Sequence, residues 1–264
     1  MTAMHSDRLD PVWSAGQILS TPIGEVTLER QLGAGKSGYS HLAQQRCLTQ
    51  VPRHGYTTRQ LNSDESLLDT PEERFVVAKR MHDEPTPFYT FSDDKVALEY
   101  RAYVKLKRIG VPVPTMLHIN PEKEYLIKEY VPGPDGLLGV RDGIIDDEII
   151  RELRLLSDLC REESINLDWF PANFVVLPAN GEEISFGEVG AGPRITKRLA
   201  YIDYELNEYS DEWSFEEWGI WYWANREGVS AFLDTGDSAA INDPPESGKP
   251  IRTHQDVVQR WLTQ

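Results

Sequence analysis

Residues 168–177, with the sequence DWFPANFVVL, decide the fold of this chain. The four apolar residues Phe174–Leu177 have the length and composition typical of a short buried strand. Asp168 and Asn173 precede this strand with the spacing D-x-x-x-x-N. A carboxylate at the first position can orient an attacking hydroxyl group or accept its proton, and an amide oxygen at the second can bind Mg²⁺. The alternative interpretation is a capped turn, because Asp, Pro and Asn are common turn residues.

A long amphipathic helix is predicted before this stretch, from about Asp146 to Glu163. Its apolar residues recur at intervals of four, three and four positions, which places them on one buried stripe. The stripe consists of Ile149, Leu153, Leu156 and Cys160. Further along the chain, Leu199–Ile202 is predicted to form a second short strand, which Asp203 follows. Asp203 can hold Mg²⁺ against phosphate oxygens, or it can be an ordinary solvated strand end.

A glycine-rich stretch lies nearer the N-terminus, between two predicted strands. The apolar residues on one face of the first strand are Val26, Leu28 and Leu32. The glycines have the spacing G-x-G-x-x-G and are Gly33, Gly35 and Gly38. The backbone N–H groups of such a loop can approach phosphate oxygens because no Cβ atoms intervene. A P-loop is excluded, because its pattern requires a glycine at position 30, where this sequence has Arg30. The alternative to a phosphate-binding loop is an ordinary glycine-rich hairpin.

Lys79 ends a further apolar run, Phe75–Ala78, which is predicted to be a short buried strand. An ammonium group there is costly unless it meets anions, and ATP phosphates with a helix carboxylate would supply them. Glu99 provides that carboxylate, on a helix predicted to be capped by Ser92 and to end at Gly110. The apolar residues of this helix are Val96, Tyr100, Tyr103 and Val104. Alternatively, Lys79 extends into solvent and Glu99 is a surface residue.

The composition excludes several classes of function. The 264 residues carry 43 acidic and 27 basic side chains, and the resulting net charge of −16 disfavours nonspecific binding to nucleic acid. No apolar run approaches the roughly 18 residues of a membrane helix, so no membrane association is expected, and a signal peptide is not expected either. Cys47 and Cys160 are too few for a disulfide framework, and we therefore expect a cytoplasmic protein.

Taken in order along the chain, these motifs resemble the protein-kinase-like superfamily over roughly residues 24 to 225. The resemblance implies ATP and Mg²⁺ as cofactors, and a hinge around Glu129 and Val131 whose backbone binds adenine. The implied catalytic residues are Asp168, Lys79 and Glu99, the implied nucleotide-binding residues are Gly33, Gly35, Gly38, Lys79, Glu129 and Val131, and the implied metal ligands are Asn173 and Asp203.

The fold class that this resemblance implies is α+β, with a bilobal protein-kinase-like architecture. We expect a β-rich N-lobe and a reduced, mainly helical C-lobe. The expected divisions are an N-terminal leader at residues 1–20, an N-lobe at residues 21–131 with an inserted loop at residues 47–72, and a minimal C-lobe at residues 132–264.

Three features depart from the usual pattern of the superfamily, and the last of them, a shortened segment after Asp203, places the chain near its compact members. The residues before Asp168 are Asn166 and Leu167 instead of His-Arg or His-Gly, and residues 203–205 read D-Y-E instead of D-F-G. Asp211 follows Asp203 by only eight residues, which leaves no room for an activation segment. The chain thus resembles the Bud-type and RIO-type atypical kinases and the aminoglycoside and choline phosphotransferases. By the same resemblance, Asp211 is expected to brace the catalytic loop.

We therefore expect an ATP-dependent kinase that transfers the γ-phosphate to a hydroxyl group, with a protein Ser or Thr favoured over a small molecule as the acceptor. One alternative is a kinase for a cationic small molecule, because seven acids and no Lys or Arg lie between Asp203 and Glu217, with four tryptophans in or near that stretch. A helix predicted from Trp213 to Asn225, with a buried aromatic face and a solvated acidic face, explains the same residues and is favoured. The other alternative is a pseudokinase that binds nucleotide or a partner.

Overall fold

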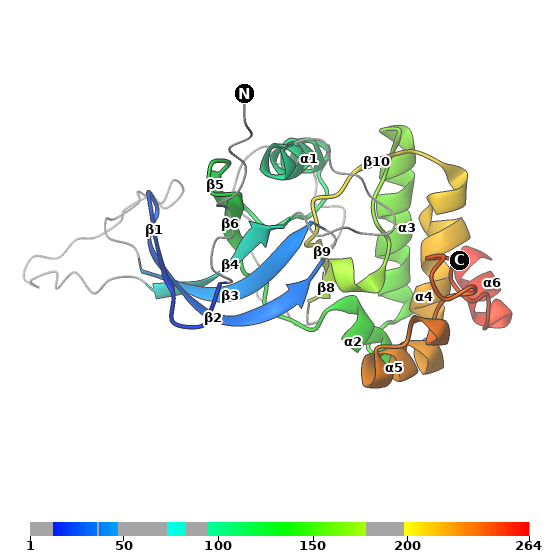
Figure 1. Ribbon diagram of the computed structural model, residues 1–264. Helices are drawn as coiled ribbons and strands as arrows, with labels where there is room; N and C mark the ends of the chain where they lie inside the picture. Colours follow the sequence, from blue (N-terminus) through cyan, green and yellow to red (C-terminus); the bar gives the residue numbers. More distant parts are fainter. Residues whose placement is uncertain (1–12, 36, 47–72, 83–93, 178–197, 264) are drawn as a thin grey trace, which may run out of the picture. The chain divides into compact units, whose positions relative to one another are not determined.

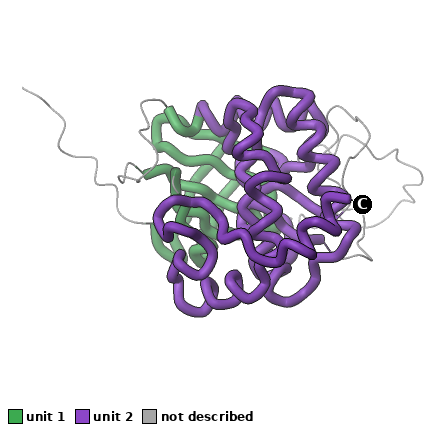
Figure 2. Tube along the Cα trace, turned by 90° about the vertical axis from the view of Figure 1, so that its right-hand side faces the viewer, with its two compact units in different colours: residues 1–96, 116–130 green, residues 97–115, 131–264 purple. Residues whose placement is uncertain are grey.

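The computed structural model describes residues 13–35, 37–46, 73–82, 94–177 and 198–263. The chain divides into two compact units, which Figure 2 colours green and purple. Unit 1 comprises residues 1–96 and 116–130, and unit 2 comprises residues 97–115 and 131–264. The segment 97–115 therefore groups with unit 2, although its position in the sequence assigns it to the N-lobe. The predicted insert at 47–72 and the predicted cap Ser92 lie outside the described residues.

Unit 1 contains a six-stranded sheet with the strand order β1-β2-β3-β4-β6-β5. Every neighbouring pair of strands is antiparallel, and β2, β3 and β4 lie side by side in Figure 1. The strands are β1 (Ile18–Thr21), β2 (Gly24–Ala34), β3 (Gly38–Arg46), β4 (Glu73–Met81), β5 (Met116–Asn120) and β6 (Tyr125–Glu129). One face of this sheet packs around a core of Val26, Leu28, Ala43, Val76, Ala78, Tyr125 and Ile127.

Two residues of the sheet depart from the predicted pattern. Val26 and Leu28 are buried as predicted, whereas Leu32 is 39% exposed. The pairing of β2 with β3 shifts register between Leu28 and Arg30 and again between Gln31 and Gly33, and each shift interrupts the alternation of faces. Phe75 is 52% exposed, since the buried part of β4 begins only at Val76. Strand β1 also begins at Ile18, within the segment expected to be a leader.

Unit 2 is mainly helical. Helix α1 (Lys95–Ile109) enters it at Ala97, and the other α-helices are α2 (Gly136–Arg141), α3 (Asp147–Glu162), α4 (Ile220–Ala224), α5 (Arg226–Thr235) and α6 (Gln255–Thr263). Two short antiparallel ribbons complete the unit, formed by β8 (Phe174–Val176) with β9 (Leu199–Tyr201) and by β7 (Ile165–Asn166) with β10 (Asn207–Glu208). A sheet in the first unit and helices in the second make the fold class α+β, as predicted.

Helix α3 confirms the prediction made from its apolar stripe. The four stripe residues, Ile149, Leu153, Leu156 and Cys160, are all fully buried. Asp146 caps the helix, because its side chain accepts a hydrogen bond of 3.0 Å from the backbone N–H of Ile149. The helix that precedes the D-x-x-x-x-N stretch is therefore fixed by its sequence at the first residue and along its buried face.

The buried face of helix α1 agrees only in part with the predicted one. Its buried residues are Lys95, Val96, Glu99, Ala102 and Leu106. Val96 is buried as predicted, whereas Tyr100 is 43% exposed and Val104 is 47% exposed. Glu99, Ala102 and Leu106 continue the buried face instead, so the predicted stripe was wrong at Tyr100 and Val104.

The segment predicted as a single helix from Trp213 to Asn225 consists of three short pieces. They are the 3-10 helix η2 (Asp211–Trp213), the π-helix η3 (Phe215–Gly219) and the α-helix α4. Ser214 has extended backbone between the first two pieces, and its side chain accepts a hydrogen bond from the backbone N–H of Glu217. Ser214 therefore ends one piece and caps the next.

Within the described residues, no helix is long and apolar enough to cross a membrane.

Candidate functional site

A tight turn holds Asp168 and Asn173 close to each other. The carboxylate of Asp168 accepts a hydrogen bond of 3.1 Å from the backbone N–H of Phe170. The side-chain amide of Asn173 donates to the backbone carbonyl of Asp168 at 3.2 Å, and its backbone N–H donates to the carbonyl of Phe170 at 3.0 Å. The turn includes the short 3-10 helix η1 (Pro171–Asn173) and leads directly into strand β8. Each of the two predicted site residues is therefore held by the backbone of the same turn.

The ribbon formed by β8 and β9 brings Asp203 to this turn. Phe174 is paired with Tyr201, and beyond this pair the backbone N–H of Ile202 donates to the carbonyl of Asn173 at 2.8 Å. Asp203 is the next residue along the chain. The structure thus collects Asp168, Asn173 and Asp203 at one end of a two-stranded ribbon within unit 2.

Tyr201 is the last residue of β9, two positions before Asp203, and is fully buried. Burial raises the pKa of its phenol well above the usual value, and the negative charges of Asp203, Asp168 and Glu205 raise it further. The hydroxyl group therefore keeps its proton, donates to the backbone carbonyl of Glu205 at 3.1 Å and accepts from the backbone N–H of Asp168 at 3.4 Å. The charges of three carboxylates therefore act on one buried phenol.

The charge of Asp168 also affects the pKa of a second buried tyrosine, Tyr222. Burial raises the pKa of Tyr222, and the charge of Asp168 raises it further. The Tyr222 hydroxyl donates to the side chain of Asn242 at 2.6 Å. Beside Asp168 in the chain, the backbone carbonyl of Trp169 accepts a hydrogen bond of 3.0 Å from the Trp223 indole.

The donor atoms near Asp203 fit Mg²⁺ by their chemistry. Asn173 offers an amide oxygen and Asp203 a carboxylate, and Mg²⁺ prefers oxygen ligands. Among the described residues, no group of three or more His, Cys, Asp or Glu side chains is arranged to hold a metal ion. Proteins that bind Mg²⁺ together with a nucleotide commonly supply only one or two carboxylates and leave the other positions to phosphates and water. The residues present therefore suit a shared site better than a complete protein cage, and their role as metal ligands stays a prediction.

Lys79 and Glu99 are both buried, and they belong to different units. Lys79 is 6% exposed in β4 of unit 1, where it pairs with Ser40 on β3 and with Leu126 on β6. Glu99 is 7% exposed on the part of α1 that belongs to unit 2. Burial argues against the surface interpretation of either side chain. Their pairing with each other stays a prediction.

The two residues predicted to form the adenine-binding hinge are also divided between the units. Glu129 is the last residue of β6 and pairs with Val76 in the sheet of unit 1. Val131 belongs to unit 2, where it packs in a small core with Val175, Leu177 and Ala200. The chain therefore passes from one unit to the other between the two positions at which adenine binding is predicted.

The three glycines of the loop differ in what surrounds them. A methyl group at Gly38 would lie 2.3 Å from the carbonyl oxygen of Arg80 on β4, so the packing of the sheet requires this glycine. A methyl group at Gly33 would meet no atom within 4 Å, and one at Gly35 only the carbonyl oxygen of Gly38 at 3.8 Å. The sheet therefore explains Gly38 and leaves Gly33 and Gly35 without a packing reason among the described residues. Lys36, which follows Gly35, lies outside the described residues.

Sequence reasoning missed two residues that form hydrogen bonds at or beside the turn that carries Asp168. One is Tyr201, described above. The other is Asn166, which is 2% exposed and donates from its side-chain amide to the carbonyl of Ser210 at 2.8 Å. Asp211, expected to brace this turn, is exposed, and its carboxylate accepts a hydrogen bond from the Tyr209 hydroxyl at 2.8 Å. The hydroxyl group of Tyr201 within an apolar strand run indicates that it needs a hydrogen-bond partner, but the sequence does not identify that partner.

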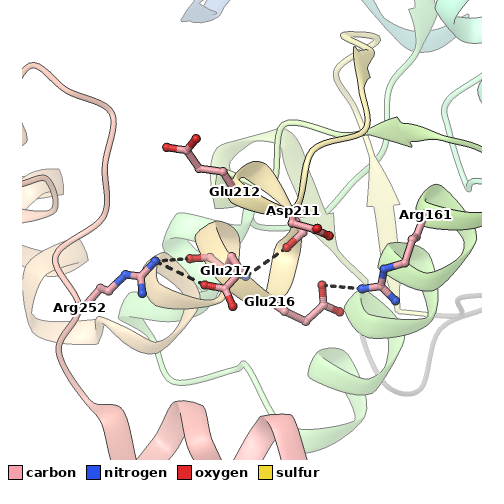
Figure 3. Close-up of a pocket in the computed structure, with 7 residues that line it drawn as sticks. Arg161, Asp211, Glu212, Glu216, Glu217 and Arg252 are labelled. Carbon is pink, nitrogen blue, oxygen red and sulfur yellow. Dashed lines mark hydrogen bonds and ion pairs between the residues drawn. The ribbon is translucent and has the colours of Figure 1, made fainter.

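The acidic stretch that follows Asp203 lines a separate pocket of about 590 Å³ in unit 2, shown in Figure 3. We call it the acidic pocket, and its lining residues are Arg161, Asp211, Glu212, Ser214, Glu216, Glu217 and Arg252. Arg161 from α3 pairs with Glu216 at 3.3 Å, and Arg252 pairs with Glu217 at 3.6 Å. The stretch contains no Lys or Arg of its own, but distant parts of the chain supply them.

Comparisons with known proteins give matches to solved structures, kinases among them, but none to a family model or a curated protein. One similar solved structure is described as the BubR1 kinase domain, with 15% identity over 76% of this chain and 51% of that chain, and a TM-score of 0.39. Another is the CAK complex from Chaetomium thermophilum bound to ATP-gamma-S, with 16% identity over 70% of this chain and 48% of that chain, and a TM-score of 0.38. The chain spans about half the length of these structures. The scores are too low to transfer residue roles.

Proposed function

We propose that this chain is a Mg²⁺- and ATP-dependent phosphotransferase that phosphorylates a hydroxyl group, with a protein Ser or Thr as the acceptor. The observation that carries the proposal is the meeting of Asp168, Asn173 and Asp203 at the end of the β8–β9 ribbon. These are the residue types that phosphoryl transfer uses to orient a hydroxyl group and to bind the metal. Backbone hydrogen bonds hold the turn and the ribbon, which suits a reaction that depends mainly on positioning.

Asp168 is proposed to be the catalytic carboxylate. An acceptor hydroxyl beside it gives its proton to the carboxylate while the hydroxyl oxygen bonds to the γ-phosphorus and the bond from that phosphorus to the β,γ-bridging oxygen breaks. The hydrogen bond from the backbone N–H of Phe170 fixes one carboxylate oxygen in orientation. Asn173 and Asp203 would hold Mg²⁺, which when bound neutralises part of the phosphate charge.

The residues of unit 1 are proposed to bind the nucleotide. Gly33 and Gly35 have no packing partner that a side chain would displace, which fits a loop whose backbone lies against phosphate. Lys79 would neutralise the α- and β-phosphates, with Glu99 fixing its orientation, and the backbone at Glu129 and Val131 would bind adenine. The burial of Lys79 supports this role, because a buried ammonium group requires anionic partners.

A protein acceptor is favoured over a cationic small molecule because of the acidic pocket. Glu216 and Glu217 already face Arg161 and Arg252, so a cationic substrate would have to compete with the chain's own guanidinium groups. The same pairs supply a structural reason for these acids. We therefore do not assign the acidic pocket to the acceptor.

The test is transfer of labelled phosphate from ATP into a cell extract, with the wild type compared with Asp168→Ala. General-base residues contribute roughly 100- to 10,000-fold, so the variant should lose at least about 100-fold in transfer. Its ATP-induced shift in melting temperature should remain, since Asp168 is not assigned to nucleotide binding. Asp234→Ala, on the exposed side of α5, is the matched control and should transfer at the wild-type rate.

The outcomes separate the alternatives. Label in protein supports the proposal, whereas label only in small molecules would overturn the assigned acceptor class. A wild type that shows an ATP-induced shift but no transfer would identify a nucleotide-binding pseudokinase. Equal transfer by wild type and Asp168→Ala would refute the assignment of the site.

A further inference from the structure

We propose that Tyr201 is a positioning residue of the phosphotransfer site, and the inference rests on the function proposed above. Its hydroxyl group joins the turn that carries Asp168 to the segment that follows Asp203. It accepts a hydrogen bond from the backbone N–H of Asp168 at 3.4 Å and donates one to the backbone carbonyl of Glu205 at 3.1 Å. One hydroxyl thus touches the backbone of both acidic segments.

The position of Tyr201 is itself tightly determined. It is the last residue of β9 and is fully buried, paired across the ribbon with Phe174. The two rings pack with their centroids 5.1 Å apart. Its backbone N–H donates to the carbonyl of Pro112 at 2.8 Å. Ring, backbone and strand pairing therefore fix the hydroxyl oxygen, and that oxygen in turn can fix the two loops.

The two hydrogen bonds of the Tyr201 hydroxyl set the position of the Asp168 turn relative to the segment that follows Asp203. In the proposed site, Asp168 faces the acceptor and Asp203 faces the metal. Asp168 must meet the acceptor hydroxyl, while Asp203 must meet the metal on the phosphates. Because a displacement of about 1 Å at a reacting centre can cost about 100-fold in rate, a bond that ties both backbones is mechanistically important. Tyr201 itself contacts neither the acceptor nor the phosphates in this scheme. Its contribution is made through Asp168 and Asp203.

Tyr204 provides a matched control three residues along the chain. It is 1% exposed, its ring packs against Tyr103 with centroids 5.6 Å apart, and its hydroxyl donates to the carbonyl of Pro114 at 2.7 Å. Removing this hydroxyl deletes a buried hydrogen bond of the same kind. The bond that is lost leads to Pro114 and not to the turn that carries Asp168.

The first measurement is hydrogen exchange at the backbone amide of Asp168, without nucleotide, in wild type, Tyr201→Phe and Tyr204→Phe. We expect exchange at Asp168 to be at least about tenfold faster in Tyr201→Phe and unchanged in Tyr204→Phe, because only the first variant removes the acceptor of that N–H. If Tyr201→Phe does not fold, the wild type decides: a protected Asp168 amide supports the link, and an amide exchanging as fast as a solvent-exposed one overturns it.

The second measurement is steady-state transfer from labelled ATP by the same three proteins. Tyr201→Phe should lose about 10- to 100-fold in kcat with KM for ATP within about twofold of wild type, and Tyr204→Phe should keep its kcat. Equal losses in both variants would indicate a general packing effect and overturn the inference. A wild type without transfer overturns the proposed function and the positioning role with it. An active wild type with an equally active Tyr201→Phe overturns the positioning role alone.

Discussion

Unit 2 contains two acidic regions that differ in what their carboxylates face. In the acidic pocket, Glu216 and Glu217 face arginines that come from α3 and from the chain before α6. At the end of the β8–β9 ribbon, burial raises the pKa of the Tyr201 phenol, and the charges of Asp203 and Asp168 raise it further. The comparison shows that a high density of acidic residues in the sequence is not enough to locate a functional site. The residues that the fold places around each carboxylate must also be known.

The largest expected difference between the two regions appears when one carboxylate in each of them is neutralised. Asp203→Asn should lower phosphate transfer by at least about 100-fold, because a proposed metal ligand and its charge are lost. Glu217→Gln, with its side chain 59% exposed, should transfer within about twofold of wild type. The rates of labelled-phosphate transfer are the measurement, and the Mg²⁺-dependent part of the ATP-induced melting shift should disappear only in Asp203→Asn.

Two results would break the comparison at this point. A strong loss of transfer in Glu217→Gln would bring the acidic pocket into the reaction. Full activity in Asp203→Asn would remove the metal role from the ribbon end. Circular dichroism of both variants is the control that separates loss of the site from loss of the fold.

A smaller effect is expected when the pocket loses a cation. Arg161 donates to the Tyr209 hydroxyl at 2.9 Å, to Asp158 at 2.7 Å and to Glu216 at 3.3 Å. The side chain is 46% exposed, so solvent screens these bonds, and Arg161→Gln should lower the free energy of unfolding by about 1 kcal/mol. Urea denaturation measures the loss, and transfer activity should remain at the wild-type level. Activity that falls with stability unchanged would contradict the structural role of this arginine.

The smallest effect is expected at the edge of the pocket. Lys249 and Glu212 form a pair at 3.6 Å in which both side chains are at least 60% exposed. Exposed pairs contribute little, and Lys249→Ala should therefore change the free energy of unfolding by less than about 0.5 kcal/mol. The same urea experiment checks this value. A loss as large as that in Arg161→Gln would mean that the pocket's charges act as one network.

Regular apolar spacing made much of the fold predictable. The stripe on α3 fixed a helix whose four marked residues are all fully buried, and the apolar run after Asn173 fixed strand β8. Prediction failed where local geometry interrupts the period. Two register shifts in β2 turn Leu32 outward, and the extended backbone at Ser214 divides an expected helix into separate pieces. Neither a register shift nor a change of helix type is visible in a pattern of apolar residues.

The candidate site was predictable to the extent that it is local in sequence. Asp168 and Asn173 belong to one turn, and their spacing alone indicated that they lie together. The link through Tyr201 was not predictable, because a tyrosine in an apolar strand run is consistent with ordinary packing until its hydroxyl partners are known. The arginine partners of the acidic pocket were also not predictable, because Arg161 and Arg252 lie far from Glu216 and Glu217 in the sequence.

The burial of Cys160 on helix α3 has a chemical consequence. Burial raises the pKa of this thiol to about 12, with further contributions from the charges of Glu163 and Glu216. At neutral pH the thiol then keeps its proton, and the thiolate is the form that oxidants and alkylating agents attack. We therefore expect Cys160 to react with these reagents mainly when unit 2 opens and exposes the buried face of α3.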